Sequence, residues 1–392
     1  MRQIIYTLLL LILNSILVSG QTSDSTQVDV IDLLFGKKKI MATNQYRSDK
    51  KVHFSVLPAA VNIAGGGRAV ITAVNAAFYL GEPASTNLSN IYLIPYTNLA
   101  DRYGLYIRPN LWLPNNKYNL LGDYRVAHFP QYSWGLGGNT RERDKSLIDS
   151  DYVRFYQIIL RKIYGHWFAG PGYYLDHYYN IEESEFEGSG HLEDYEGTPL
   201  TATTSSGITL NLVYDSRANA INPVQGGYML VTWRFNEEGL GSTYDNQTLF
   251  IDVRKYLSLS SSIRHTIGLR SYYWTLLTGE SPYLDLPATN WAPATGIASR
   301  GFEIGRYRST SFLYGEVEQR YQLSNNGLWG MVVFANLASA SEYDTSQFKY
   351  WQMGAGVGLR IKLNKYSATN IACDLGFSRN YWGLWLSIGE MF

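Results

Sequence analysis

The side chains that could carry out chemistry in this sequence do not stand at the spacings that metal sites require. The six histidines lie at positions 53, 128, 166, 177, 191 and 265, and no two are four residues apart beside a glutamate, as in helical zinc sites. The segment 182–196 contains seven carboxylates and His191, but it lacks the spacing of an EF-hand calcium loop. We interpret it as a solvated outer loop and expect no metal ion.

Motifs for nucleophilic catalysis and for cofactor binding are also missing. Cys373 is the single cysteine, and its alternation with Ile371 and Leu375 is typical of a packing residue rather than a nucleophile. The sequence contains no Gly-Xaa-Ser-Xaa-Gly elbow. The glycine repeat at 354–358 lies in a strand-like pattern and does not open a helix, as a dinucleotide loop would. We therefore predict that the protein is not an enzyme and uses no cofactor.

The composition favours a β protein and excludes one class of partner. The chain has 392 residues, with 33 Lys and Arg against 33 Asp and Glu. Nucleic-acid binding requires a basic surplus, so no nucleic-acid partner is expected. Only 17% of residues are charged, whereas tyrosine (32) and glycine (36) are abundant. Such a chain can conceal its apolar residues by alternation, and its length fits one large barrel as well as two domains.

Residues 1–20 have the pattern of a secretory signal peptide. Arg2 supplies a short positive region, Ile4–Leu17 is mostly apolar, and small residues precede a predicted cleavage site before Gln21. The apolar run of about 14 residues is shorter than the roughly 20 that a transmembrane helix needs. Export is therefore predicted.

Residues 21–51 predict a short periplasmic extension. Within Val28–Phe35, Val30, Ile31, Leu34 and Phe35 fall on one helical face. Gly36 stands where a helix would end, and a basic linker, Lys37–Lys39, follows. We expect a short amphipathic helix that rests near the mouth of the main domain.

From residue 52 to residue 392 the apolar pattern has a period of two. In the window 351–364, every second residue is apolar and the interleaved residues are polar or glycine. A strand of this length crosses a bilayer at a tilt, with one face in lipid and the other in a polar lumen. The same alternation recurs at 229–236 and 263–270, where arginines occupy the inward register. Inward arginines suit a water-filled or plugged barrel.

Turn signals divide this region into strands joined by alternately short and long connections. Short connections are predicted at 114–117, 164–166 and 324–327, and long ones at 131–151, 181–207 and 277–310. This asymmetry is typical of outer-membrane barrels. The pattern predicts an all-β fold, an antiparallel transmembrane barrel of about sixteen strands, closed because an open edge in lipid leaves backbone groups unpaired.

Two short motifs carry a resemblance to a known family. Asp215-Ser216-Arg217, followed by Pro223 and Gly226, resembles the turn motif of the BamA/TamA superfamily of bacterial surface antigen barrels. Arg300-Gly301-Phe302 matches the loop tip that in this family folds back into the lumen. The resemblance implies that this loop enters the barrel.

Further segments extend the resemblance from about residue 50 to the end of the chain. Gly358-Leu359-Arg360 and Asp374-Leu375-Gly376 match the closing strands of the family in order and spacing. Phe129-Pro130 and the glycine-rich stretch 135–138 resemble a subgroup found in Bacteroidetes-type bacteria. In the family the chain ends in a strand that the barrel-assembly machinery recognises; here that assembly signal corresponds to Leu384, Leu386, Ile388 and Phe392. Glu390 is expected in the outward register.

The resemblance also implies partners for Arg300. The alternation of the next predicted strand places Glu316 and Glu318 on the inward register, and Glu318 matches the family's Glu-Xaa-Arg position. The family usually supplies a second carboxylate on the following strand, where this chain has Asn336. We therefore expect Arg300 to be held by one carboxylate and one amide, with weaker charge compensation than is usual in the family.

The leading functional hypothesis is a non-enzymatic outer-membrane barrel that aids insertion or translocation of proteins or lipids. Only about thirty residues separate Gln21 from the first predicted strand, so POTRA modules are not expected, and a periplasmic partner protein could supply the missing platform. Other expected partners are outer-membrane lipid and, during biogenesis, the barrel-assembly machinery. The alternatives are a passive diffusion pore and an outer-membrane hydrolase; the latter lacks any Ser/His/Asp arrangement.

Overall fold

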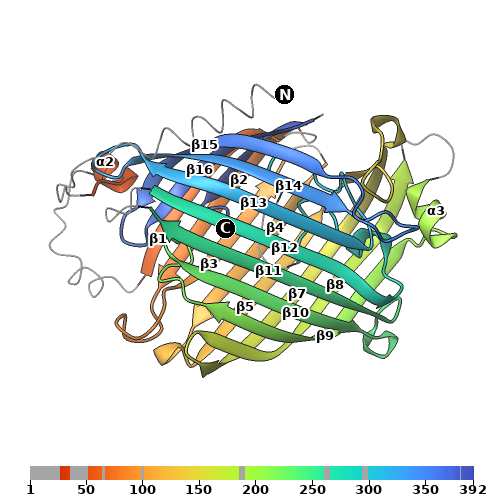
Figure 1. The fold of residues 1–392 in the computed structure, drawn as a ribbon, viewed down its shortest axis with the longest axis horizontal. Coiled ribbons are helices and arrows are strands. Elements are labelled where there is room, and N and C mark those ends of the chain that lie inside the picture. Colours follow the sequence, from red (N-terminus) through yellow and green to blue (C-terminus); the bar gives the residue numbers. More distant parts are fainter. Residues whose placement is uncertain are drawn as a thin grey trace.

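The computed structural model of the protein describes residues 27–35, 52–63, 67–98, 101–184, 190–259, 265–293, 299–379 and 381–392. In this part of the chain, 17 strands form one antiparallel sheet that curls into a barrel (Figure 1). The predicted signal peptide and the basic linker at 37–39 lie outside the described residues. No helix among the described residues is both long enough and apolar enough to cross a membrane.

The first half of the sheet consists of β1 (Val52–Ile63), β2 (Gly67–Phe78), β3 (Ser89–Thr97), β4 (Tyr103–Trp112), β5 (Tyr118–His128), β6 (Gln131–Ser133), β7 (Ser146–Tyr164), β8 (Trp167–Ser184) and β9 (Ala202–Asp215). The second half consists of β10 (Gly226–Asn236), β11 (Asn246–Ser258), β12 (His265–Gly279), β13 (Ser311–Gln322), β14 (Trp329–Ala340), β15 (Gln352–Asn364), β16 (Thr369–Ser378) and β17 (Trp382–Ile388). The helices are α2 (Val30–Phe35) and α3 (His191–Glu196), with short 3-10 turns η2 (Pro114–Asn116), η3 (Glu142–Asp144), η4 (Glu238–Leu240) and η5 (Tyr283–Asp285).

Each wall strand pairs antiparallel with the next wall strand in sequence. β6 is the exception, because it lies in the connection between β5 and β7 and pairs only with β7, while β5 pairs with β7 directly. Without β6, sixteen of the 17 described strands form the wall. The predicted all-β, antiparallel barrel of about sixteen strands is therefore confirmed.

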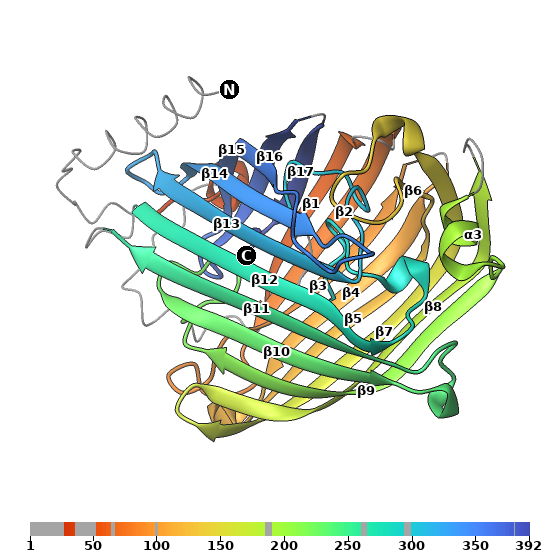
Figure 2. The ribbon, with the colours of Figure 1, turned by 45° about the vertical axis from the view of Figure 1, so that its right-hand side comes forward.

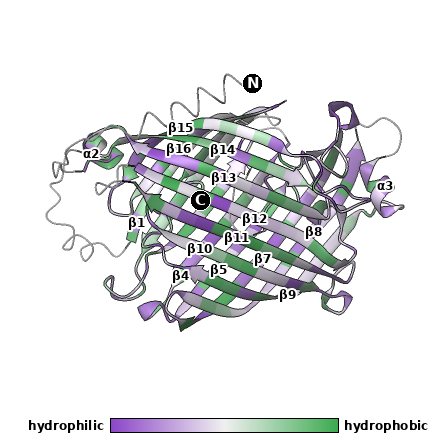
Figure 3. Ribbon diagram, in the orientation of Figure 1, coloured by the Kyte–Doolittle hydropathy of each residue, from purple (hydrophilic) through white to green (hydrophobic). Residues whose placement is uncertain are grey.

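The two faces of the wall have opposite polarity, as the period of two predicts. On β15, the side chains of Met353, Val357 and Leu359 are 66%, 47% and 43% exposed on the outside, whereas the inward Arg360 is 4% exposed. Figure 3 shows hydrophobic and hydrophilic residues alternating along the strands. An apolar outer face and a polar interior are what a strand in a bilayer requires.

The long connections are shorter than predicted, because the strands continue into them. β7 begins at Ser146, and Ile148 and Tyr152 are buried in alternation with outward neighbours. The outward positions in this stretch include Asp149 and Asp151, whose charge makes the segment resemble a loop in sequence. The alternation of buried and outward residues therefore continues into the first part of β7, where the outward side chains are charged and not apolar.

Part of the segment 182–196 is also more ordered than predicted. Glu183 accepts hydrogen bonds from the backbone N–H groups of His191 (3.0 Å) and Leu192 (2.9 Å), at the start of α3. A carboxylate at a helix N-terminus is favourable, and Leu192 is buried in the main core. The prediction of a solvated loop is wrong for α3, which packs against the barrel.

The two terminal strands of the sheet meet at a seam. β1 pairs with β2 along its whole length, and β17, which has only seven residues, pairs with β16. In the described part of the chain, no cross-strand register joins β1 to β17, although the two lie close together (Figure 2). Ile388 at the end of β17 packs with Ala73 of β2 and Ile94 of β3. Packing of side chains therefore replaces a hydrogen-bonded ladder at the seam.

Helix α2 lies at the end of the barrel where this seam and the short turns are found. Asp29 and Asp32 cap its first turn reciprocally: the backbone N–H of Asp32 donates to Asp29 (2.8 Å) and that of Asp29 to Asp32 (3.2 Å). Asp32 also pairs with Lys365 in the β15–β16 turn, at 2.6 Å. Val30 packs against the cluster that contains Ile388. The helix therefore touches both the turns and the seam.

Candidate functional site

The connection between β12 and β13 folds into the barrel instead of leaving it. Among its described residues, Tyr283, Leu284 and Leu286 are buried in the main core. The buried Arg308 holds this path by donating to the carbonyl oxygens of Tyr283 and Leu284, each at 2.9 Å. The loop tip with Arg300 is thereby brought against the inner wall, as the resemblance implies.

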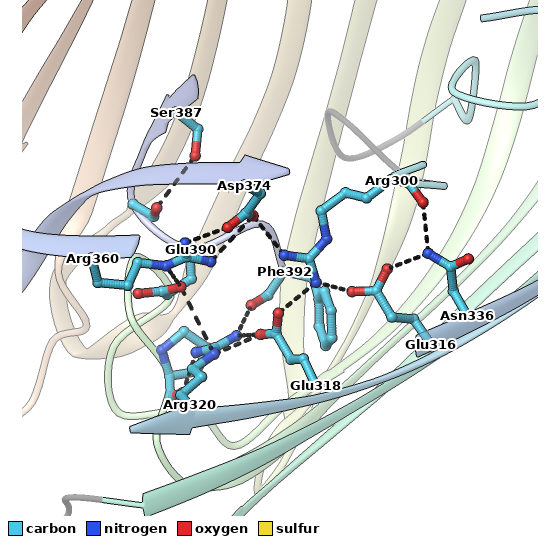
Figure 4. Close-up of polar contacts among 12 residues, drawn as sticks. Arg300, Glu316, Glu318, Arg320, Asn336, Arg360, Asp374, Ser387, Glu390 and Phe392 are labelled. Atoms are coloured by element: carbon cyan, nitrogen blue, oxygen red, sulfur yellow. Dashed lines mark hydrogen bonds and ion pairs between the residues drawn. The ribbon is translucent and has the colours of Figure 1, made fainter. Parts of the chain in front are cut away.

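Arg300 lies in a ring of carboxylates from two separate parts of the wall (Figure 4). Its Nη2 donates to Glu318 at 2.6 Å and also to Glu316, both on β13, and its Nη1 donates to Asp374 of β16 at 2.6 Å. The guanidinium carbon stands 3.8 Å from the ring centre of Phe334. Burial alone would lower the pKa of Arg300, but the three carboxylates raise it well above its usual value.

Small residues leave the room that the loop tip occupies. Gly301 has φ = +91°, a left-handed conformation that glycine adopts without strain. A Cβ on Gly376 of β16 would come within 2.7 Å of the Gly301 nitrogen, and one on Gly354 of β15 within 3.1 Å of the Phe302 ring. Glycines on the inward register of the closing strands therefore admit the tip.

Two further arginines extend the network toward the C-terminus. Arg320 of β13 donates to Glu318 at 2.6 Å and to the carbonyl oxygen of Phe392 at 2.8 Å. Arg360 of β15 donates to Glu390 at 2.7 Å and to Asp374. We call these three arginines and the carboxylates of Glu316, Glu318, Asp374 and Glu390 the lock cluster. Most of its carboxylates are shared between two guanidiniums.

Glu390 follows β17 and is the carboxylate nearest the chain end. The prediction that it faces outward is wrong, since its side chain is only 1% exposed and pairs with Arg360. Burial alone would raise the pKa of Glu390, but Arg360 and Arg320 lower it to about 2. The last residues turn into the lumen after β17 instead of continuing the strand, which reverses the expected register.

Asn336 of β14 does not have the role that was expected of it. Its Nδ2 donates to the backbone oxygen of Arg300 at 2.8 Å and to Glu316 at 3.3 Å. The amide therefore holds the loop backbone and does not accept from the guanidinium. The prediction of weak charge compensation at Arg300 is wrong, because Glu316 and Asp374 join Glu318.

Asp374 is the partner that sequence reasoning missed, although a signal for it was present. It alternates with the outward Cys373 and Leu375, so its inward register could be inferred. Its cross-strand neighbour is Gly358, and a Cβ on that glycine would lie 1.8 Å from an Asp374 oxygen. Because Gly358 has no side chain, the Asp374 carboxylate can extend over β15 and contact Arg300 and Arg360.

The family turn motif is connected to the lock cluster. Arg217 pairs with Asp215 through two hydrogen bonds of 2.9 and 2.7 Å. Gly226 has φ = +102°, and a Cβ there would lie 2.6 Å from the Ser216 oxygen. The carbonyl oxygen of Pro223 accepts from Arg320 at 2.9 Å. Arg320 therefore links the turn to Glu318, which in turn binds Arg300 of the loop tip. The sequence did not indicate this link.

The residues of the predicted assembly signal are divided between the seam and the lumen. Leu384 and Leu386 share the outward register of their β16 partners Leu375 and Cys373 and border a cavity at the seam, and Ile388 belongs to the cluster at the seam. The ring of Phe392 lies in the lumen, 6.2 Å from that of Tyr256 on β11. These four residues are therefore brought to the seam and the lumen in the folded protein. Recognition by the assembly machinery remains a prediction.

The arrangement can fix a loop but shows no cofactor site. Within the described ranges, no three His, Cys, Asp or Glu side chains are grouped so that they could hold a metal ion. Each guanidinium of the lock cluster already donates to carboxylates, which is a strong, oriented form of hydrogen bonding. These contacts attach the β12–β13 loop to the inner wall of the barrel.

The comparisons with known proteins agree with this architecture. The model of the Omp85 superfamily domain matches residues 126–368. BamA from Haemophilus ducreyi lacking POTRA domains 1–3 superposes with a TM-score of 0.53 at 10% identity, over 86% of this chain and 69% of that chain. CdiB from Acinetobacter baumannii superposes with a TM-score of 0.55 at 12% identity, over 86% of this chain and 60% of that chain. No curated protein matches the sequence. At these identities the two structures show a shared fold.

Proposed function

The chain belongs to the Omp85 superfamily, and from this membership we propose that it aids the insertion or translocation of proteins or lipids, acting through the barrel itself and without catalysis. Barrels of this superfamily reside in the outer membrane. Residues 1–20 would direct export, 21–51 would remain in the periplasm, and 52–392 would span the membrane. The barrel-assembly machinery would insert the protein among outer-membrane lipid, and a periplasmic partner would deliver its cargo.

The observation that carries the proposal is the seam between β1 and β17. In the described chain no register joins these strands, so each keeps an edge with backbone groups available for pairing. Unpaired groups in a bilayer are costly, and an incoming strand could satisfy them by adding to the edge. Separation of two packed edges requires less work than breaking a full ladder. The seam is therefore the favoured place for lateral opening.

The alternative of a passive diffusion pore is less well supported. The β12–β13 loop lies inside the lumen and is anchored by Arg300 and Arg308. A loop held in this way narrows the path that a solute would follow. Low or flickering conductance in planar bilayers would favour the insertion function, and a large, steady open state would favour the pore.

A reversible cross-link across the seam tests the proposal. His53 of β1 and Tyr366 of the β15–β16 turn stack with ring centroids 5.5 Å apart. In a Cys373→Ala background, which removes the native thiol, we would introduce His53→Cys and Tyr366→Cys and join them with a short thiol cross-linker. Liposomes that contain the barrel should accelerate folding of an unfolded outer-membrane protein, and the cross-link should abolish the acceleration until it is reversed.

A matched pair away from the seam provides the control. Tyr273 of β12 and Phe348 of the β14–β15 connection have ring centroids 6.3 Å apart. Tyr273→Cys with Phe348→Cys, cross-linked in the same background, should leave the acceleration unchanged. Equal inhibition by both pairs, or none by the seam pair, would remove the seam from the mechanism.

A further inference from the structure

A second cluster of arginines lies on the side of the lumen formed by β4, β5, β7, β8 and β10, apart from the lock cluster. Asp123 of β5 accepts from Arg125 at 2.8 Å, and its oxygens lie 3.5 Å from Arg108 Nε and 3.6 Å from Arg154 Nη1. One carboxylate thus faces three guanidiniums from three neighbouring strands. We call Arg108, Arg125, Arg154 and Arg234, with Asp123 and Asp176, the wall cluster.

The second carboxylate of the wall cluster is shared as well. Asp176 of β8 accepts from Arg154 at 3.0 Å and from Arg234 of β10 at 2.7 Å, and two tyrosine hydroxyls, of Tyr152 and Tyr156, also donate to it. Four guanidiniums therefore surround two carboxylates. The cluster therefore has more positive than negative charges. Such an excess is unfavourable in a buried site, where charges need partners.

A third nearby acid does not restore the balance. Asp285 of η5 accepts a hydrogen bond from Ser205, and no arginine of the described ranges forms an ion pair with it. Burial and the neighbouring Asp176 raise the pKa of Asp285 well above its usual range. Its carboxyl group therefore contributes less than a full negative charge near neutral pH.

The least compensated member is Arg108 of β4. Its side chain is 25% exposed, and its guanidinium stacks on Tyr106, with 5.6 Å between the guanidinium carbon and the ring centre. Its Nε is buried and makes no hydrogen bond, and the described residues provide no hydrogen bond to the rest of the group. Asp123, at 3.5 Å, is already engaged by Arg125. Arg108 therefore presents donors that no protein group uses.

These donors face an internal cavity of about 490 Å³. Arg108 and Arg125 line it together with the apolar Leu121, Ile158, Leu230 and Trp291. Its lining also includes Arg217, Arg254 and the carboxylates of Asp215, Glu303 and Glu390. Leu384 and Leu386 of β17 extend the apolar lining to the seam. A cavity of this size, mostly apolar with a few convergent polar groups, has the features of a small-molecule site.

We propose that this cavity binds an anionic amphiphile from the surrounding bilayer, with an acyl chain along the apolar lining and a carboxylate or phosphate head that accepts hydrogen bonds from Arg108 and Arg125. A single anionic group would supply the negative charge that the wall cluster lacks, through charge-assisted hydrogen bonds. The seam-side lining places the chain next to the lipid phase. The inference goes beyond the proposed function, because it assigns a resident ligand site and not the route of a cargo.

Binding of a fluorescent polyene fatty acid to the purified barrel in non-ionic detergent tests this site. We expect saturable binding of the fatty acid at one equivalent and little binding of its methyl ester, which has the same chain without the charge. Inorganic phosphate should fail to displace the fatty acid, since the apolar lining would not be used. Equal binding of acid and ester, no saturable binding, or full displacement by phosphate would each overturn the proposal.

Substitutions locate the site within the barrel. Arg108→Gln should weaken fatty-acid binding about tenfold or more, the effect of losing a charge-assisted bond. Arg161→Gln, at an exposed position on β7, should bind as the unmutated protein does. The comparison of acid with ester uses unmutated protein, so it decides the question even if Arg108→Gln folds poorly. Failure of the cross-linking experiment above would leave this result standing, because binding requires no seam opening.

Discussion

The lock cluster and the wall cluster of the described lumen differ in charge balance. The lock cluster sets three guanidiniums among four carboxylates, and its loop tip is fully enclosed, with Arg300 1% exposed. The wall cluster sets four guanidiniums around two carboxylates and borders a cavity of about 490 Å³. Complete compensation fixes a segment of the chain in place. Incomplete compensation leaves donors that an anionic ligand could use.

Both clusters set a guanidinium against aromatic rings, since Arg300 stands 3.8 Å from the ring centre of Phe334, but they differ in the space beside it. Around Arg300, inward glycines such as Gly376 provide space for a loop of the same chain. Around Arg125, the rings of Tyr106 and Trp291 lie 5.0 and 5.9 Å from the guanidinium carbon. Aromatic faces orient an arginine without neutralising it. The lock cluster therefore receives protein backbone, whereas the wall cluster has only two carboxylates to compensate four guanidiniums.

The largest effect is expected when the central cation of the lock cluster is removed. Arg300→Ala leaves three buried carboxylates without their shared partner, a change that costs about 3–5 kcal/mol when a buried pair is broken. The barrel should lose its resistance to SDS at a lower temperature, and external protease should cleave the β12–β13 loop. The shift in gel mobility on heating and a proteolysis time course measure both effects.

Two controls separate the lock from a general loss of stability. Arg306→Ala, in the same loop, removes an arginine that donates to the hydroxyl and backbone oxygens of Thr140 and forms no ion pair with a carboxylate of the described residues, and it should have a much smaller effect. Glu318→Ala should weaken the loop less than Arg300→Ala, and the double variant should fall short of the sum. Additive effects, or a loop that protease cleaves in the unmutated protein, would contradict the lock.

The sequence was sufficient for the barrel and for part of the lock cluster. Alternation over long windows indicates which residues face lipid, because the bilayer imposes that pattern on every strand. The resemblance brought together Arg300 and Glu318, and the structure has them 2.6 Å apart. Asp374 was missed because it depends on the register between β15 and β16, which places it opposite Gly358. Alternation defines a face but not a cross-strand neighbour.

The wall cluster could not be inferred from sequence by the same means. Its arginines stand on four different strands, β4, β5, β7 and β10, and only the curvature of the sheet brings Arg234 within reach of Asp176. In the sequence, each arginine is recognised only as a polar residue on the inward register. The inward turn of Glu390 and Phe392 was hidden for a related reason, since the short β17 ends before the pattern does.

An intermediate effect is expected from pH at the edge of the lock cluster. The folded pKa of Glu390, about 2, lies below the usual value of 4.5. Its ionised form therefore stabilises the fold above pH of about 4.5, and this stabilisation, up to about 3 kcal/mol, is lost as pH falls toward 2. Glu390→Gln should be less stable at neutral pH and should lose less stability on acidification.

The control for this pH effect is Glu193→Gln, an exposed carboxylate on α3. It should reproduce the pH profile of the unmutated barrel, followed by urea unfolding in detergent between neutral pH and the acid range. A profile of Glu390→Gln that is parallel to that of the unmutated barrel would show that its two arginines do not hold the carboxylate in the charged form.

The smallest change in stability is expected in the wall cluster, and it should be a gain and not a loss. Arg108→Gln removes one of four guanidiniums around two carboxylates and breaks no hydrogen bond of the described chain. Without ligand, we expect stability to remain unchanged or to rise by up to about 1 kcal/mol, because repulsion among the arginines decreases. Arg125→Gln, which removes two donors from Asp123, should instead destabilise the barrel.

Added fatty acid should reverse the order of stability between Arg108→Gln and the unmutated barrel, since a ligand stabilises only the form that binds it. The unmutated barrel should gain stability with fatty-acid concentration, and Arg108→Gln should not. If Arg108→Gln were as destabilising as Arg125→Gln, and fatty acid stabilised neither more than the other, the wall cluster would be a second structural lock and the contrast between the two clusters would disappear.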